Sequence, residues 1–155
     1  MLAILCMVDA EQELRWWQWG VLIVLAFDVV GGVAANATVA ATRRYHRPER
    51  PYGPLLFSVA HVQPFILALL LPGLTTGGAA LLWLSGALGT LLVIHSPPAV
   101  KRSVALGYCA LAIAALSLLV PTSGLAWLAP AFVLKLVAAH AVPMWGAAEL
   151  PLEER

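Results

Sequence analysis

Hydrophobic positions along this chain gather into long runs, and the polar stretches between the runs are short and rich in proline and glycine. Five runs are long enough, or nearly so, for a helix to cross a bilayer, which takes about 20 apolar residues. They cover residues 17–41, 54–71, 76–95, 103–120 and 125–146. The connections "RPERPYGP", "LPGLTTGG", "HSPPAVKR" and "VPTSG" leave no room for a further domain. The pattern predicts an all-α polytopic membrane protein, a bundle of five transmembrane helices in which successive helices are antiparallel.

Positive charges fall on alternate connections, and this predicts the orientation of the bundle. Lysine and arginine are enriched in the cytoplasmic loops of membrane proteins. The first and third connections carry all of the loop cations, namely Arg43, Arg44, Arg47, Arg50, Lys101 and Arg102. We therefore expect the N-terminus outside and the C-terminus in the cytoplasm. Residues 1–15 are then an extracytoplasmic or interfacial segment, residues 16–147 a single transmembrane domain, and residues 148–155 a cytoplasmic tail.

The composition agrees with a membrane location and argues against other classes of protein. Of the 155 residues, 61% are hydrophobic and 11% charged, and the mean hydropathy is +0.87. A soluble domain has about 25% charged residues and could not hide this much apolar surface. The net charge of +1, without a basic stripe interleaved with aromatic residues, argues against a nucleic-acid partner. Abundant alanine, glycine and leucine with little lysine and asparagine suggest a bacterial protein of the inner (plasma) membrane, with several passes.

The first run contains polar residues that a lipid-facing helix would exclude. Asp28 lies about 13 Å from Trp19 along a helix, which places it near the centre of the bilayer. An acid at this depth costs about 2.5–3.5 kcal/mol on insertion scales and normally faces the protein interior. We expect its face of the helix to pack against a neighbouring helix. The helical period places on that face the small and polar residues Gly31, Gly32, Ala35, Asn36, Thr38 and Thr42.

The fifth run supplies a cation at a matching depth. Lys135 lies about 15 Å from Leu125 along a helix, too deep for its side chain to reach water comfortably. Opposite charges at one depth in a small bundle are expected to meet, so the sequence predicts an Asp28–Lys135 pair. Buried ion pairs stabilise poorly in comparison with apolar packing. The pair therefore indicates either a functional site or a contact that only fixes the register of the helices.

Other polar and aromatic residues complete a candidate site around this pair. His61 lies in the second run three positions before Pro64, which cannot donate a backbone hydrogen bond. We expect Asp28, His61 and Lys135 to be catalytic. The expected substrate-binding residues are Phe27, Asn36, Thr38, Gln63, Phe65 and His140. Neither an i, i+4 histidine pair nor a His-Glu-x-x-His motif occurs, so neither a metal nor another cofactor is expected.

The basic first connection has two interpretations. Its arginines fix the topology and attract anionic headgroups at about 1 kcal/mol per cation, which accounts for them without a specific site. Alternatively, Arg43, Arg44 and Arg47 bind the phosphate or carboxylate of an amphiphilic substrate through their planar guanidinium groups. The first interpretation is favoured and the second stays open, so these three arginines are candidate headgroup-binding residues.

Three classes of function fit a proton-exchanging acid within the bilayer. The favoured one is a membrane enzyme that isomerises or cyclises a lipophilic substrate, such as an isoprenoid, by acid/base catalysis. A small proton-coupled transporter or channel is the second, and a non-catalytic subunit of a membrane complex the third. The enzyme predicts a pocket open to lipid, the transporter a path to both faces, and the subunit an occluded Asp28. The expected partners are the bilayer, a lipophilic small molecule and, in an oligomer, further copies of the chain.

Overall fold

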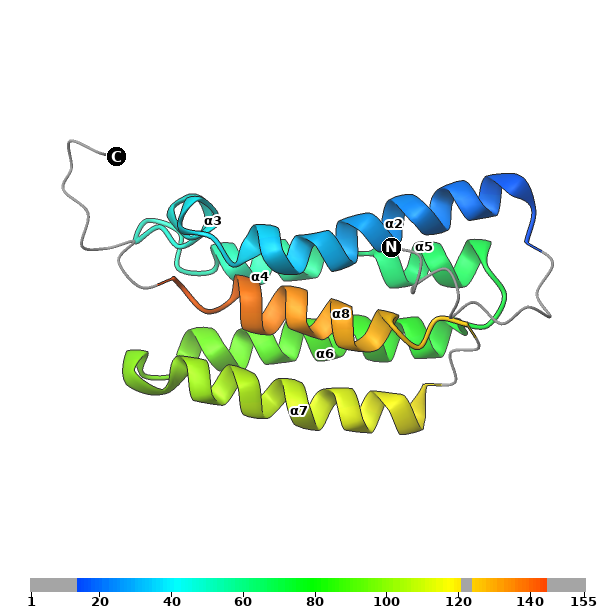
Figure 1. Cartoon of the computed structure of the whole chain (residues 1–155). Helices are drawn as coiled ribbons and strands as arrows, with labels where there is room; N and C mark the ends of the chain where they lie inside the picture. Colours follow the sequence, from blue (N-terminus) through cyan, green and yellow to red (C-terminus); the bar gives the residue numbers. More distant parts are fainter. Residues whose placement is uncertain (1–13, 121–123, 145–155) are drawn as a thin grey trace.

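The computed structural model describes residues 14–120 and 124–144, and within these ranges the regular structure is helical, with no strand. The long helices run along one common direction, and the short α3 turns away from it, as Figure 1 shows. In chain order they are α2 (Trp16–Asn36), α3 (Val39–Tyr45), α4 (Gly53–Ala60), α5 (Gln63–Leu70), α6 (Thr76–His95), η1 (Pro98–Val100), α7 (Lys101–Leu119), α8 (Leu128–Val133) and η2 (Leu134–His140). The predicted all-helical architecture is confirmed for the part of the chain that the structure describes.

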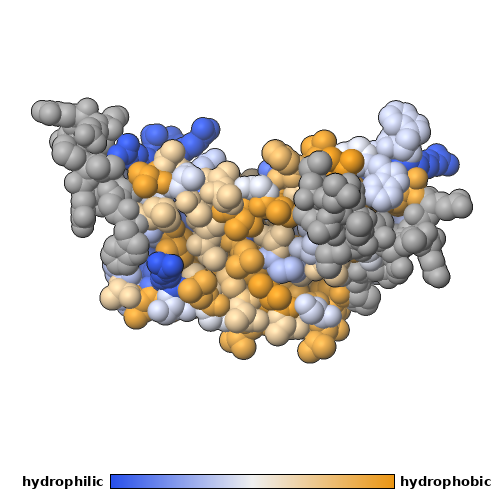
Figure 2. Space-filling model, in the orientation of Figure 1, coloured by the Kyte–Doolittle hydropathy of each residue, from blue (hydrophilic) through white to orange (hydrophobic). Residues whose placement is uncertain are grey.

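Within residues 14–120 and 124–144, four helical stretches are long and apolar enough to cross a membrane. They are Trp16–Asn36, Gly53–Leu70, Thr76–His95 and Pro98–Leu119, and a shorter apolar stretch, Leu128–His140, lies where the fifth span was expected. Figure 2 shows hydrophobic side chains over the middle of one face and the most hydrophilic side chains towards its ends. This distribution is the one that a bilayer requires, because its apolar core is bounded by two polar interfaces.

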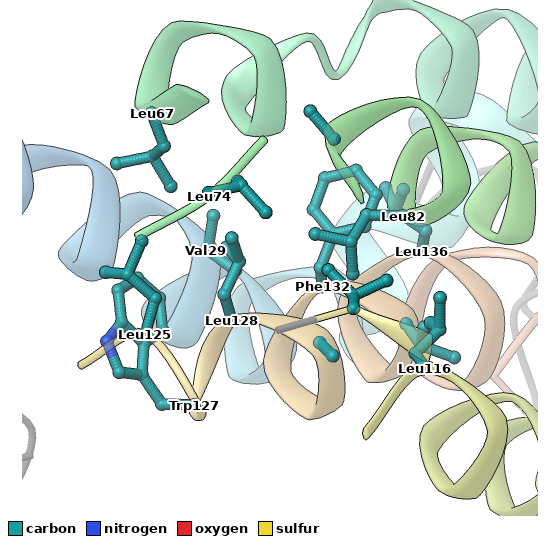
Figure 3. Close-up of a cluster of buried hydrophobic side chains, with 14 of the residues drawn as sticks. Val29, Leu67, Leu74, Leu82, Leu116, Leu125, Trp127, Leu128, Phe132 and Leu136 are labelled. Atoms are coloured by element: carbon teal, nitrogen blue, oxygen red, sulfur yellow. The ribbon is translucent and has the colours of Figure 1, made fainter. Parts of the chain in front are cut away.

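The helix formed by α8 and η2 lies at the centre of the bundle, packed against α2, α6 and α7. Its side chains make up much of the buried cluster in Figure 3, where Phe132 and Leu136 lie against Leu82 of α6. Two glycines let α6 approach this helix closely. A Cβ atom at Gly86 would lie 2.7 Å from Leu136, and one at Gly89 would lie 2.6 Å from Val137. Since lipid tails are as apolar as leucine, this core is stabilised by close packing rather than by exclusion of water.

The first and last expected spans are not continuous α-helices. α2 ends at Asn36 and α3 restarts after Thr38, whose extended backbone and side chain cap the new helix. The Thr38 hydroxyl donates to the carbonyl of Ala35 at 2.9 Å and accepts from the amide of Ala41 at 3.2 Å. In the last span η2 is a π-helix, a form that is frequent at functional sites. The expectation of a continuous first helix through residue 41 is therefore wrong.

The second expected span is interrupted at His61, between α4 and α5. Pro64, which cannot donate a backbone hydrogen bond, lies in the first turn of α5. Side chains satisfy carbonyl groups at the break. The His61 ring donates through Nδ1 to the carbonyl of Phe57 at 2.6 Å, and the Trp83 indole donates to that of Val59 at 2.9 Å. These bonds make a broken helix tolerable at this depth, where no water replaces lost backbone partners.

Candidate functional site

Asp28 of α2 and Lys135 of η2 form an ion pair, as the sequence predicts. Lys135 Nζ lies 2.8 Å from Asp28 Oδ2 and 3.1 Å from the backbone carbonyl oxygen of the same residue. The two side chains differ in environment, since that of Lys135 is 2% exposed and that of Asp28 is 49% exposed. The expectation that Asp28 faces fully inward is therefore wrong. Its carboxylate lies over a buried cation and is partly exposed at the surface of the bundle.

Gln63 of α5 is the third member of this site. Its amide nitrogen donates to Asp28 Oδ2 at 2.9 Å, so that one carboxylate oxygen joins three separate helices. In the described ranges, Asp28 Oδ1 receives no hydrogen bond and the buried amide oxygen of Gln63 has no partner. Oδ2 is thus anchored, while Oδ1 is available to a molecule that approaches Asp28 from outside the bundle.

Of two adjacent glycines in α2, Gly32 lies directly against the Lys135 side chain and Gly31 does not. A Cβ atom at Gly32 would lie 2.5 Å from Lys135 Cε and 3.0 Å from Nζ, whereas one at Gly31 would meet no atom within 4 Å. Gly32 therefore leaves the space in which the lysine side chain crosses α2 to reach Asp28. The sequence placed both glycines on a common packing face, but Gly31 lies at an exposed position.

Gly32→Ala should weaken the Asp28–Lys135 pair, and Gly31→Ala is its matched control. Each substitution raises helix propensity by about 0.5–1 kcal/mol, so the difference between the two isolates the contact with Lys135. Overpacking of this kind costs about 1–3 kcal/mol. We expect Gly32→Ala to unfold at a lower denaturant concentration than Gly31→Ala in detergent micelles. Equal unfolding midpoints would show that the lysine does not need the space beside Gly32.

Aromatic and imidazole rings occupy the region beyond the ion pair. The ring of Phe57 stacks on that of His140 with centroids 3.8 Å apart, and it also contacts the ring of His61, with centroids 4.1 Å apart. Tyr45 meets His140 edge-on at 4.8 Å. His140 lies five positions after Lys135 in η2, and His61 lies two positions before Gln63, which donates to Asp28. The structure thus brings these two histidines close to the pair, although ring contacts rather than hydrogen bonds to the pair hold them there.

His46 joins this ring cluster from the connection after α3, and the sequence pattern did not single it out. Its Nε2–H donates to the backbone carbonyl of His140 at 2.7 Å. Burial lowers the pKa of His46, and the hydrogen bond opposes this effect, so the neutral ring is the favoured form near neutral pH. The signal in the sequence was its position among the arginines of the first connection, which the positive-inside pattern already explained.

Four other residues expected at the site do not converge on the ion pair. Thr38 caps α3, and Asn36 Nδ2 is buried without a hydrogen-bond partner in the described part of the chain. Phe27 is 74% exposed. Phe65 pairs edge-on with Trp83, their centroids 6.2 Å apart. The two phenylalanines expected to shield a substrate therefore have other positions, one on the surface and the other against α6.

The basic connection forms an open pocket on the surface. Its lining residues are Ala40, Arg43, Arg44 and Arg47. Ala40, Arg43 and Arg44 share one face of α3 at the spacing i, i+3 and i+4, and Arg47 follows just after the helix ends at Tyr45. The guanidinium group of Arg44 also lies 5.6 Å from the ring centroid of Tyr45. The structure thus brings together the three arginines that the sequence marked as candidate headgroup ligands.

The described residues contain no group of three or more His, Cys, Asp or Glu side chains arranged to hold a metal ion. No known protein family, curated protein or solved structure matches this chain. The functional assignment therefore rests on the geometry of the ion pair, the ring cluster and the basic pocket.

Proposed function

We propose that this protein is a membrane-embedded enzyme that uses the Asp28 carboxyl group for acid/base chemistry on a lipophilic substrate. The supporting observation is a carboxylate that is 49% exposed and pairs with a lysine that is 2% exposed. A catalytic acid must be accessible to its substrate, and Asp28 is exposed on a surface that lipid would cover. A pair that only fixed helix register would have no need of this opening.

The hydrogen bonds around Asp28 suit a proton donor that must also take a proton back. In its protonated form, Asp28 donates from Oδ1 to one carbon of a substrate double bond. Lys135 and Gln63 then stabilise the new carboxylate through Oδ2, where they already donate at 2.8 Å and 2.9 Å. Loss of a proton from a neighbouring carbon to Asp28 completes an isomerisation. Attack by a second double bond before that loss completes a cyclisation, and neither reaction consumes a proton overall.

The proposal includes five membrane spans with an extracytoplasmic N-terminus in the inner membrane. In Figure 1, α3 and the turn between α6 and α7 lie at the same end of the bundle. These segments carry the cations of the first and third connections, so the positive-inside rule assigns this end to the cytoplasm. The α8–η2 helix is the fifth span in this arrangement, and its central position accounts for its low exposure to lipid.

The enzyme proposal is tested by deuterium transfer to lipids, an assay that works whatever the identity of the substrate. Membrane lipids from a host lacking the gene are incubated in D2O with the purified protein, and mass spectrometry compares them with a protein-free sample. Protonation of a substrate carbon leaves deuterium on that carbon, so at least one lipid should gain mass only when the protein is present. The absence of any protein-dependent labelling would contradict the proposal.

A proton-coupled transporter is the second candidate, favoured by the interrupted helices. α2 gives way to α3, α4 breaks at His61, and η2 is a π-helix, so that each of the three helices that meet at the ion pair is irregular or lies next to a break. Broken helices of this kind form the binding sites of many transporters. Proton flux into liposomes that contain the protein, without deuterium transfer to lipid, would favour this function. A subunit role would instead require a partner that covers Asp28, and both activities would then be lacking.

A further inference from the structure

The open pocket beside α3 follows closely in the chain after α2, the helix that carries the exposed acid Asp28. We propose that this pocket binds the phosphate group of the amphiphilic substrate, and that the substrate tail follows α2 to Asp28. The inference rests on the proposed enzymatic function and names its substrate class: a phosphate-bearing lipid with a double bond in its tail.

The pocket has the chemistry of a phosphate site. Arg44 and Arg47 are exposed, and Arg43 lies beside them on the same lining. The like charges on this shared lining repel each other, and an anion between them offsets the repulsion. One guanidinium group can donate two parallel hydrogen bonds to a phosphate group, in a fixed planar geometry. Ala40 contributes only a methyl group to the lining, so the space between the arginines stays open to a ligand.

A strip of small, exposed residues connects the pocket with the acid. Gly31 and Ala35 follow Asp28 at the spacing i+3 and i+7, and all three positions are exposed. A Cβ atom at Gly31 would meet nothing within 4 Å. Ala40 comes twelve positions after Asp28, and the chain between them, helical except at residues 37 and 38, spans at most about 24 Å. A long acyl or isoprenoid tail covers this distance, so a phosphate in the pocket would place the middle of the tail beside the carboxyl group.

The layout of the bilayer supports the same placement. A lipid phosphate lies at the interface and its tail enters the hydrocarbon. The pocket is at the end of the bundle, and Asp28 lies well inside the apolar stretch Trp16–Asn36. The substrate would therefore keep the position of an ordinary lipid and reach the acid by moving sideways. A free phosphate ester has the same head chemistry without a tail, and the two sources must be separated by experiment.

The test measures lipid binding by native mass spectrometry on the full-length protein in detergent. The probes are dioleoyl phosphatidate, dioleoylglycerol as its neutral counterpart, and glycerol 3-phosphate as a phosphate without a tail. Arg44→Gln/Arg47→Gln removes two pocket charges. Arg50→Gln/Arg102→Gln is the matched control, because it removes two exposed charges that do not line the pocket. We expect phosphatidate to bind about tenfold more weakly to the pocket variant only, the effect of losing a charge-assisted hydrogen bond.

A second pair of variants tests the path of the tail. Gly31→Leu and Gly107→Leu each add a large side chain where a Cβ atom meets nothing within 4 Å, so both should fold. Gly107 lies on α7, away from the pocket. Gly31→Leu should weaken phosphatidate binding, and Gly107→Leu should not. Equal binding by the two arginine variants, by the neutral lipid or by the two leucine variants would overturn the inference. Glycerol 3-phosphate binding as tightly as phosphatidate would overturn it in favour of a free phosphate.

The binding assay tests the phosphate pocket and the deuterium assay tests the enzymatic function. Either proposal can be contradicted while the other holds. If phosphatidate binding follows the pocket variants but no lipid gains deuterium, the pocket is a lipid site and the enzymatic function is wrong. If lipids gain deuterium but the pocket variant binds and labels them as well as the control does, the enzyme stands and the pocket has no part in substrate recognition.

Discussion

Asp28→Leu should lower the free energy of unfolding by about 3–5 kcal/mol, because Lys135 would stay buried without its counter-charge. The side chain of Lys135 is 2% exposed, and its other hydrogen-bond acceptor is a backbone carbonyl at 3.1 Å, which cannot neutralise a charge. The measurement is reversible unfolding in mixed detergent micelles. The double variant Asp28→Leu/Lys135→Met should recover most of the loss, because apolar residues commonly replace a buried pair without penalty.

The same series of variants supplies its own control. Lys135→Met alone leaves Asp28 with the Gln63 hydrogen bond at 2.9 Å and with an exposed side, so its loss of stability should be smaller than that of Asp28→Leu. The two single effects and the double effect give a coupling energy, expected at about 0.5–3 kcal/mol for residues in contact. A coupling energy of zero, or an Asp28→Leu variant as stable as the wild type, would show that the pair does not stabilise the bundle.

Asp28→Asn should reduce deuterium transfer to lipid by about 10²–10⁴-fold, the usual contribution of a general acid or base. This variant should lose part of its stability, because Lys135 is left without its counter-charge, but it should still fold, since the amide oxygen of asparagine accepts the hydrogen bonds from Lys135 and Gln63. The assay compares initial rates of labelling at equal amounts of folded protein. Glu49→Gln, which removes an exposed acid in the first connection, is the control and should keep full activity. Full activity of both Asp28→Asn and Asp28→Leu would refute the assignment of Asp28.

The ion pair could be predicted from the sequence because depth in a membrane follows directly from residue number. A helix rises about 1.5 Å per residue, so the distances of Asp28 and Lys135 from the ends of their runs placed both near the middle of the bilayer. An unpaired charge there is costly, which made an encounter between the two the expected solution. The same arithmetic identified the long apolar runs that the structure has as helices.

The exposure of Asp28 could not be predicted, because it depends on how the helices pack. The helical period showed that Asp28, Gly31 and Gly32 share a face, but that face is wide. In the structure its Gly32 edge meets Lys135 while its Gly31 edge is open. Only the position of the central helix decides which edge is covered. The sequence pattern therefore identified the right face of α2 and assigned too much of it to the interior.

The helix interruptions and the hydrogen bond of His46 could not be predicted from the sequence, for a related reason. Thr38 has an ordinary place within an apolar helix, and its capping bonds appear only once the backbone turns at that position. His46 acts through a bond to the carbonyl of His140, which is 94 positions away in the chain. Hydrophobic periodicity carries information about neighbours within one helix and none about such distant partners.

The central claim is that the Asp28 carboxyl group lies within the membrane, takes up a proton and can be reached from lipid. Its most direct test is modification by dicyclohexylcarbodiimide, a lipid-soluble reagent that attacks protonated carboxyl groups. Of the eight acidic residues, Asp28 is the one that lies within an apolar run. In protein reconstituted into bilayers, we predict labelling of Asp28 by this reagent and not by a water-soluble carbodiimide. An unlabelled Asp28, or equal labelling by both reagents, would contradict the account.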